Sequence, residues 1–265
     1  IDDTRKKRTV VPVRFVRACR SGHIGDIDWY DFVHGGLGGA PKFPHAMHLD
    51  FLLRRWRREP ADNTLRMVTM NLDKMAAGGI YDHLAGGFAR YSVDKRWLVP
   101  HFEKMLYDNA LLLPLYAEGA RRWDNPLLRE AAEGIANWLM TTMRQPDGGY
   151  AASIDADADG EEGGFHIWRR GMIEQVLDGD EAALFCRVYG LDGAPNFENR
   201  SWHLQRARPR RNDPAETLDE QATALLQDVR EIDVAVAIAV EQGVHHARRL
   251  RGLALHVLLL TAEQA

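Results

Sequence analysis

The densest run of chemically useful side chains lies between residues 86 and 109. His101 is the candidate proton-transfer group, because the pKa of an unperturbed imidazole lies near neutrality. Glu103 follows it closely and is a candidate catalytic carboxylate. The same run supplies aromatic rings, cations and further carboxylates that could hold a substrate. These candidate binding residues are Phe88, Arg90, Tyr91, Asp94, Trp97, Lys104 and Asp108.

Apolar periodicity predicts that a helix positions part of this run, from His101 to Arg121. On such a helix His101, Lys104 and Asp108 share one face, at i, i+3 and i+7. Since the neighbouring residues are mostly leucines, we expect this polar stripe to face an enclosed space. The alternative is an ordinary Lys104–Asp108 ion pair beside a capped helix start.

A second candidate region is acidic. Between Gln145 and Phe165 the chain has six carboxylates and no basic residue. We predict that Asp155 or Asp157 points into the same space as His101 and acts as a catalytic carboxylate. The alternatives are a solvated acidic turn and a calcium site. An EF-hand is not expected, because its twelfth position would be His166 instead of Glu. We predict neither a metal nor a cofactor.

The elements that must position these residues are helical hairpins. A Gly-Gly-apolar motif recurs at 35–37, 86–88 and 148–150, at intervals long enough for two helices and their loops. Asp62 and Asn125 are candidate helix caps. The helices expected from apolar spacing are His45–Arg58, Asp62–Ala77, His101–Arg121, Asn125–Met143, Met172–Leu177 and Glu181–Tyr189. The predicted fold class is therefore all-α, with few and brief strands.

Composition excludes several classes of protein. The chain has 265 residues, of which 45% are hydrophobic and 27% charged, as in globular proteins. No apolar run approaches the length of a spanning helix, and Arg5–Arg8 is not followed by the apolar segment of a signal peptide. The net charge of −4 argues against a nucleic-acid partner. Cys19 and Cys186 form no disulfide or metal pattern, which favours a reducing compartment. We expect a cytoplasmic protein without a membrane or nucleic-acid partner.

The chain divides into three parts by composition. Residues 203–265 contain no Phe, Tyr or Trp, and residues 206–211 are rich in Arg and resemble a linker. We treat 206–265 as an uncertain helical tail and 1–30 as an uncertain, basic N-terminal flank. The informative part is 31–205.

Three segments of this central part carry a resemblance to a known family. They are GGLGGAPKFP (35–44), MAAGGIYDHLAGGFARYSVDKRWLVPHFEKMLYDNA (75–110) and DGGYAASIDADADGEEGGFHIW (147–168). The chain resembles the thioredoxin-domain-containing proteins that include YyaL-type and spermatogenesis-associated members. This resemblance implies an (α/α)6 toroid, similar to six-hairpin glycosidases and the N-acylglucosamine 2-epimerase group. It supplies no established reaction.

The chain departs from that family in two respects. It has no thioredoxin-like domain and no Cys-x-x-Cys, so a redox role is not carried over. It also lacks a recognisable second half of the toroid, and the aromatic-free tail does not resemble the family's next segment. We therefore expect an incomplete toroid, produced by truncation or by a reading-frame shift.

The resemblance and the residues together predict a carbohydrate-active domain of sugar epimerase/isomerase or glycoside hydrolase type, with a small-molecule carbohydrate as partner. Aromatic rings at 88, 91 and 97 would stack on a sugar, while Arg90 and Lys104 would hold oxygens or an anionic group. The alternative is a non-catalytic helical scaffold or binding module that kept the packing of the fold. Calcium binding by residues 155–162 is a third, weaker hypothesis. The sequence does not predict an oligomeric state.

Overall fold

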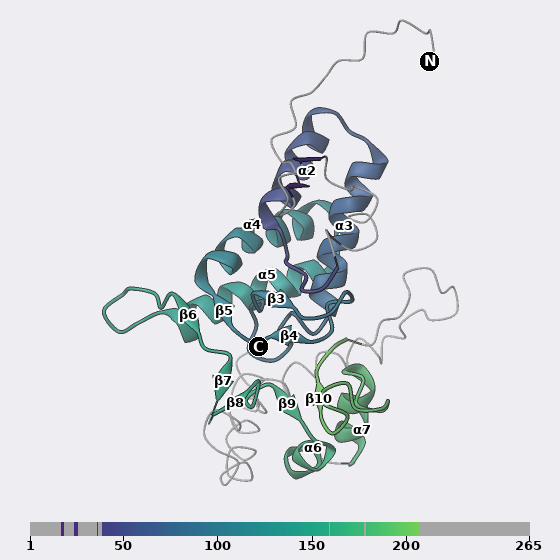
Figure 1. Cartoon of the computed structure of the whole chain (residues 1–265), viewed down its shortest axis with the longest axis vertical. Coiled ribbons are helices and arrows are strands. Elements are labelled where there is room, and N and C mark those ends of the chain that lie inside the picture. The colour runs from purple at the N-terminus through teal and green to yellow at the C-terminus, as the bar shows by residue number, and fades with distance from the viewer. Residues whose placement is uncertain are drawn as a thin grey trace, which may run out of the picture.

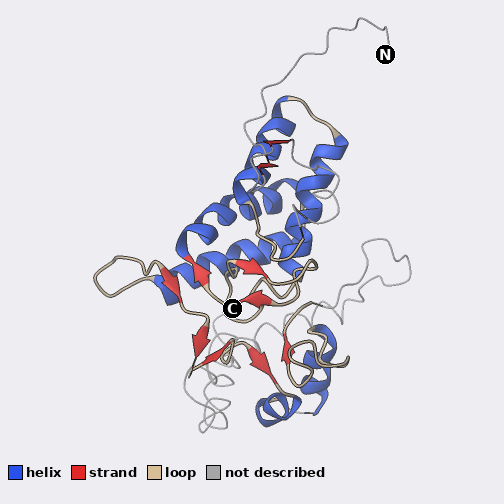
Figure 2. Cartoon of the chain, in the orientation of Figure 1, coloured by secondary structure: helices blue, strands red, loops and turns tan. Residues whose placement is uncertain are grey.

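A computed structural model describes residues 17–18, 24–25, 36, 39–158, 160–177 and 179–206. The described chain is mostly helical, and its helices lie in two regions (Figure 1). The first region holds two long helical hairpins, and the second is a smaller lobe of two short helices. Short strands connect and flank them (Figure 2). The flank 1–30 and the tail 206–265 lie almost entirely outside the described residues.

The two long hairpins follow the predicted pattern closely. The first pairs α2 (Ala46–Arg58) with α3 (Asp62–Ala77), and the second pairs α4 (Leu106–Trp123) with α5 (Pro126–Trp138). A short π-helical segment, η1 (Leu139–Met143), continues α5. The Asn125 side chain accepts a hydrogen bond from the backbone N–H of Leu127, which confirms the predicted cap. Asp62 makes no such bond, because it is already the first helical residue after Ala61.

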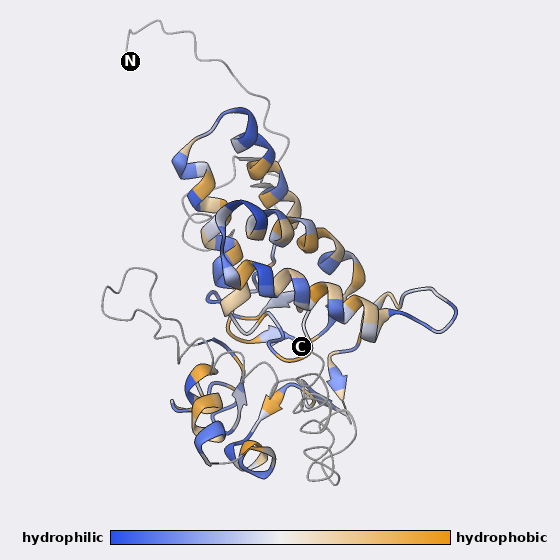
Figure 3. Cartoon of the chain, turned by 180° about the vertical axis from the view of Figure 1, so that it is seen from behind, coloured by the Kyte–Doolittle hydropathy of each residue, from blue (hydrophilic) through white to orange (hydrophobic). Residues whose placement is uncertain are grey.

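The hairpins pack into one hydrophobic core because each helix buries an apolar face. Helix α2 contacts α3 and α4, and α5 contacts the same two helices. Figure 3 shows hydrophilic and hydrophobic residues alternating along these helices. The fully buried residues of this core include Leu49, Leu72, Phe88, Tyr116, Leu128 and Ile135.

The smaller lobe has its own core. It consists of α6 (Arg170–Val176), α7 (Gly179–Val188) and the antiparallel pair β9 (Ile167–Trp168) and β10 (Trp202–His203). Its buried cluster includes Trp168, Ile173, Phe185, Tyr189 and Leu191. Beyond β10 the described chain returns to the hairpins, where the Arg206 backbone N–H donates to the Ala77 carbonyl and its guanidinium pairs with Glu130.

Four further two-stranded pairs are antiparallel. They are β1 (Arg17–Ala18) with β2 (Ile24–Gly25), β3 (Tyr91–Ser92) with β4 (Pro100–His101), β5 (Lys104–Met105) with β6 (Ser153–Ile154), and β7 (Asp157–Ala158) with β8 (Glu161–Glu162). The pairing of β5 with β6 brings the 104–105 and 153–154 segments together. The candidate loops therefore meet beneath the hairpins (Figure 1).

The helix predicted from His101 begins five residues later, at Leu106, and this start was predicted wrongly. The backbone of His101 pairs with Tyr91, and that of Lys104 pairs with Ile154. These residues were predicted to be helical, but they form strand pairs. His101, Lys104 and Asp108 do not share a helix face, because only Asp108 lies in α4.

The recurring Gly-Gly motif performs two different tasks. At Gly86, where φ is +79°, an added Cβ would lie 2.3 Å from the Gly134 carbonyl oxygen of α5. The loop can approach α5 this closely only because the residue has no side chain. At Gly148, φ is +87° but nothing lies within 4 Å of the Cβ position, so that glycine serves a turn in open surroundings. The repeat therefore marks left-handed turns in two different environments.

Candidate functional site

The candidate residue His101 forms an exposed polar pair with a residue of a distant loop. His101 lies on β4, and its Nδ1 is 2.7 Å from Oε1 of Glu162 on β8. The two side chains are 31% and 55% exposed, so the pair is open to solvent. A carboxylate on Nδ1 favours the tautomer in which Nδ1 carries the proton, and Nε2 then keeps its lone pair. The pair therefore has the arrangement of an oriented general base.

Aromatic rings lie beside this pair. The Tyr91 ring stacks on the His101 imidazole, with centroids 5.0 Å apart and planes inclined by 17°. The centroid of the Phe43 ring lies 4.9 Å from that of Tyr91, so Phe43, Tyr91 and His101 form a row of three rings. Phe43 is 37% exposed and comes from the GGAPKFP segment. The first two glycine-rich segments thus supply flat apolar surface next to the imidazole, which suits stacking on a ring-shaped ligand.

A second charged group, formed by Arg90, Glu103 and Asp108, lies beside the beginning of α4. Arg90 donates to Oε2 of Glu103 over 3.2 Å, and its backbone N–H bonds the Glu103 carbonyl. Burial raises the pKa of the neighbouring Asp108 to about 6, the Arg90 charge opposes that rise, and the Glu103 charge adds to it. Oδ2 of Asp108 is buried without a hydrogen-bond partner among the described residues. A carboxyl group in these surroundings is partly protonated near neutral pH and can serve as an acid.

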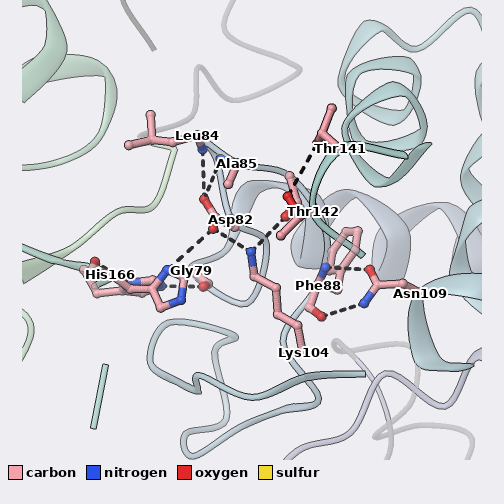
Figure 4. A network of polar contacts seen from close by, with 12 residues as sticks. Gly79, Asp82, Leu84, Ala85, Phe88, Lys104, Asn109, Thr141, Thr142 and His166 are labelled. Carbon is pink, nitrogen blue, oxygen red and sulfur yellow. Dashed lines mark hydrogen bonds and ion pairs between the residues drawn. The ribbon is translucent and has the colours of Figure 1, made fainter. Parts of the chain in front are cut away.

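Lys104 does not join this open group. Its Nζ donates to Oδ2 of Asp82 over 2.6 Å and to the Gly86 carbonyl over 2.9 Å (Figure 4). The two side chains are 6% and 12% exposed. The other oxygen of Asp82 accepts the backbone N–H groups of Leu84 and Ala85, at 3.0 Å each. Burial would raise the pKa of Asp82, but Lys104, His166 and these hydrogen bonds hold it well below its ordinary value.

Three histidines surround this buried pair. His166 Nδ1 lies 3.5 Å from Oδ2 of Asp82, and His203 and His83 face the backbone carbonyls of Gly79 and Gly78. Burial lowers the pKa of His166 to about 4 and that of His83 to about 3, and it also lowers the pKa of His203. The three rings are therefore uncharged at neutral pH.

A small cavity opens beside these histidines, where the hairpins meet the smaller lobe. Its volume is about 30 Å³, and Asp82, His83, His166 and His203 contribute to its lining. That is room for one or two water molecules and not for a sugar ring. The sequence predicts that His101 faces an enclosed space large enough for a substrate. Among the described residues His101 lies instead on a partly exposed surface, where it pairs with Glu162.

The remaining candidates have other surroundings. Phe88 and Trp97 are 0% and 1% exposed, so they pack in the core and present no face to a ligand. Asp94 closes the loop between β3 and β4 by accepting the backbone N–H groups of residues 96, 98 and 99. Asp155 and Asp157 are exposed, and the Asp155 carboxylate accepts the Asp157 backbone N–H over 3.3 Å. The acidic turn reaches His101 through Glu162, not through these two residues.

Sequence reasoning missed three functional candidates. Glu162 was counted among the acidic residues but not selected, because a continuous run gives no local signal for which carboxylate turns inward. Asp82 and His166 were also missed. Asp82 stands four residues before the Gly86-Gly87 pair and His166 directly after Phe165, inside two of the three segments that carry the family resemblance. That position was the available signal.

Neither a metal cluster nor a spanning helix is found in the described part of the chain. Within the described residues, no three His, Cys, Asp or Glu side chains lie close enough together to hold one metal ion. Asp159, part of the calcium hypothesis, lies outside them, as does Cys19. Cys186 is a free, buried thiol. None of the helices in the described ranges has the length and apolar character needed to cross a bilayer.

Comparison with known proteins agrees with the resemblance read from the three glycine-rich segments. The chain is 35% identical to spermatogenesis-associated protein 20 of Homo sapiens over an alignment of 187 residues, which covers 63% of this chain and 24% of that protein. The protein of the same name from Mus musculus is 35% identical over an alignment of 158 residues, which covers 56% of this chain and 20% of the relative. An uncharacterized protein of Caenorhabditis elegans is 39% identical over an alignment of 163 residues, which covers 56% of this chain and 22% of the relative.

The chain spans about a fifth to a quarter of the length of these curated relatives. A family model described as a domain of unknown function, DUF8724, matches residues 2–70. That match covers the N-terminal flank, α2 and the first half of α3, and it does not reach the open pair. Homologues named spermatogenesis-associated protein 20 therefore support the family to which the glycine-rich segments pointed.

Proposed function

We propose that this chain carries a carbohydrate-active, enzyme-like domain of sugar epimerase/isomerase or glycoside hydrolase type, built on hairpins of an (α/α)6 toroid. The observation that carries the proposal is the His101–Glu162 pair beside the stacked rings of Tyr91 and Phe43. An oriented imidazole next to apolar ring faces combines proton transfer with a surface for a sugar ring.

The pair suggests the role of each atom. Glu162 accepts the Nδ1 proton of His101, holds the ring and stabilises the imidazolium that forms when Nε2 takes a proton from the substrate. Arg90, fixed by Glu103, offers N–H donors to substrate oxygens. Asp108, with its pKa raised to about 6, is the candidate proton donor. Lys104 is excluded from substrate contact by its burial against Asp82.

Two reactions fit these roles. In an epimerisation, Nε2 of His101 removes the proton of a carbon next to a carbonyl group, and a second group returns a proton to the opposite face of that carbon. In a hydrolysis, the protonated Asp108 gives its proton to the leaving oxygen, while His101, held by Glu162, takes a proton from the water that adds to the sugar carbon. Both reactions use His101 as the base, and Asp108 is the candidate for the second proton-transfer group.

The test uses the whole chain and a panel of reducing sugars and glycosides, with product detection by NMR. We expect turnover of at least one sugar, and a loss of about 100-fold or more in kcat/KM for His101→Gln with an unchanged thermal midpoint. Glu162→Gln should also lose activity, whereas Glu161→Gln, its exposed neighbour, is the matched control and should not. Full activity in His101→Gln, or no turnover of any sugar by the native chain, would overturn the proposal.

A second candidate function is a non-catalytic sugar-binding module or scaffold. It is favoured by the burial of Phe88, Trp97 and Lys104. These predicted substrate-binding residues of the 86–109 run therefore pack inside the protein. A binding module predicts that the native chain retains a sugar without turnover and that His101→Gln retains it equally well. Equilibrium dialysis with the same panel separates this outcome from catalysis.

A further inference from the structure

We infer that Asp82 is a positioning residue. Held by Lys104, it acts through His166 to position the acidic turn, residues 155–158 and 160–166, so that Glu162 reaches His101. The inference relies on the proposed function only for the use of the His101–Glu162 pair, and its structural content can be tested without a substrate.

The first step is that the Asp82 carboxylate is fixed in place. One oxygen accepts the N–H groups of Leu84 and Ala85 at 3.0 Å each, and the other accepts the Lys104 ammonium at 2.6 Å. Lys104 is held in turn by the Gly86 carbonyl at 2.9 Å. A carboxylate with both oxygens occupied in this way has one orientation, and burial strengthens each contact.

The second step is that the end of the acidic turn rests on this carboxylate (Figure 4). The Nδ1 atom of His166 lies 3.5 Å from Oδ2 of Asp82, on the side away from the backbone N–H donors. Its ring stacks on Phe102, with centroids 5.3 Å apart and planes inclined by 6°. The His166 side chain is therefore held by a polar contact and by a ring contact at once.

The third step carries this position along the turn to Glu162. The His166 backbone N–H bonds the Gly163 carbonyl at 2.8 Å, and the Gly163 N–H bonds the Ala156 carbonyl at 2.9 Å. Glu162 is the residue before Gly163 and pairs with Asp157 in the β7–β8 hairpin. A shift of the His166 backbone would consequently shift Glu162.

The fourth step is that the turn fits closely against the strand that carries His101. Phe102 directly follows His101, and a Cβ on Gly163 would lie 2.3 Å from the Phe102 ring. Real side chains do not approach so closely, so any residue other than glycine must force the turn and the Phe102 ring apart. The same Phe102 ring thus links the buried carboxylate, the turn and the open pair.

The spectroscopic signature is the tautomer of His101. While Glu162 accepts from Nδ1, the neutral ring holds its proton on Nδ1, and ring ¹⁵N chemical shifts distinguish this form from the Nε2–H form. The reference for loss of this contact is Glu162→Ala, which has no side-chain acceptor. We expect Gly163→Ala to give the tautomer signature of Glu162→Ala, because the added Cβ pushes the turn and the Phe102 ring apart.

Gly160→Ala is the matched control. Gly160 has φ +81° against +71° for Gly163, so both substitutions impose the same kind of backbone strain, but nothing lies within 4 Å of the Gly160 Cβ position. It should keep the native tautomer signature. An equal change in both variants would attribute the effect to backbone strain and overturn the inference.

Two further substitutions test Asp82 itself. His166→Phe keeps a flat ring on Phe102 and removes the nitrogen that faces Asp82, and Asp82→Asn removes the charge. We expect both to shift the His101 signature toward that of Glu162→Ala while circular dichroism stays native. A native signature in His166→Phe, which retains the buried Asp82–Lys104 pair, would overturn the role of Asp82 even where Asp82→Asn does not fold.

These measurements use the free protein and thereby separate the two proposals. A native chain that turns over no sugar, but whose His101 signature responds as described, would remove the enzymatic function and keep the positioning role. A chain that is active, but whose signature ignores Gly163 and His166, would do the opposite.

Discussion

Two polar side-chain pairs with nearly equal contact distances define the site, and they lie in opposite surroundings. Lys104 and Asp82 are 2.6 Å apart with side chains 6% and 12% exposed, whereas His101 and Glu162 are 2.7 Å apart with side chains 31% and 55% exposed. The first pair is closed off by the hairpins and the smaller lobe. The second is in contact with solvent beside an aromatic row.

The comparison shows that contact distance says little about what a pair does. A buried pair matters for stability, because removal of one partner leaves the other charge buried without water or a counter-charge. An exposed pair contributes little to stability. The chain therefore keeps one charged pair fixed inside and leaves a second polar pair in contact with solvent.

The largest expected effect comes from breaking the buried pair. Lys104→Met should lower the free energy of unfolding by about 3–5 kcal/mol, because Asp82 is left as an uncompensated buried carboxylate. Urea denaturation followed by tryptophan fluorescence measures this loss.

The control is the double variant Lys104→Met with Asp82→Asn. It removes both charges and should recover a large part of the lost stability. If the loss of unfolding free energy in the double variant equalled the sum of the losses in the two single variants, the ion pair would not be the source of the effect.

The next effect in size is a dependence of stability on pH. The folded state holds His166 at a pKa of about 4 and His83 at about 3, both below the ordinary value of 6.5. The unfolded chain therefore binds more protons as the pH falls below about 6.5, and stability decreases with acidification. Between pH 7 and pH 5 each ring should remove about 2 kcal/mol. Chemical denaturation at a series of pH values records the slope.

His166→Phe sharpens this prediction. It removes one of the two rings, so the loss of stability between pH 7 and pH 5 should shrink by about 2 kcal/mol. Asp82 does not contribute in this range, because its lowered pKa makes its contribution disappear only in stronger acid. If His166→Phe left the pH dependence of the unfolding free energy unchanged, the pH effect could not be assigned to the buried histidines.

The smallest expected effect is on the exposed pair. Glu162→Gln should change the free energy of unfolding by no more than about 0.5 kcal/mol, as for other exposed charge pairs. Thermal unfolding beside Glu161→Gln provides the measurement. A loss comparable to that of Lys104→Met would break the comparison, since it would make the open pair as structural as the buried one.

Local periodicity predicted the helices well because a helix is held by contacts three and four residues apart. The predicted Asp62–Ala77 helix is found with the same bounds, and the Asn125 cap is confirmed. The start of the next helix was wrong because His101 and Lys104 pair with Tyr91 and Ile154, the latter 50 residues away from Lys104. No pattern within the segment contains that partner.

The candidate site divides in the same way. The sequence by itself determined that His101, Arg90 and Asp108 belong to one chemically dense segment and that an acidic turn follows later. Apart from the start of the helix predicted from His101, it also determined where the helices lie and which glycine-rich loops join them. Tertiary structure alone decided that Glu162, not Asp155 or Asp157, meets His101, and that Lys104 turns inward to Asp82. The physical reason is that side-chain partners far apart in the chain are chosen by how the loops fold against each other, which local spacing does not specify.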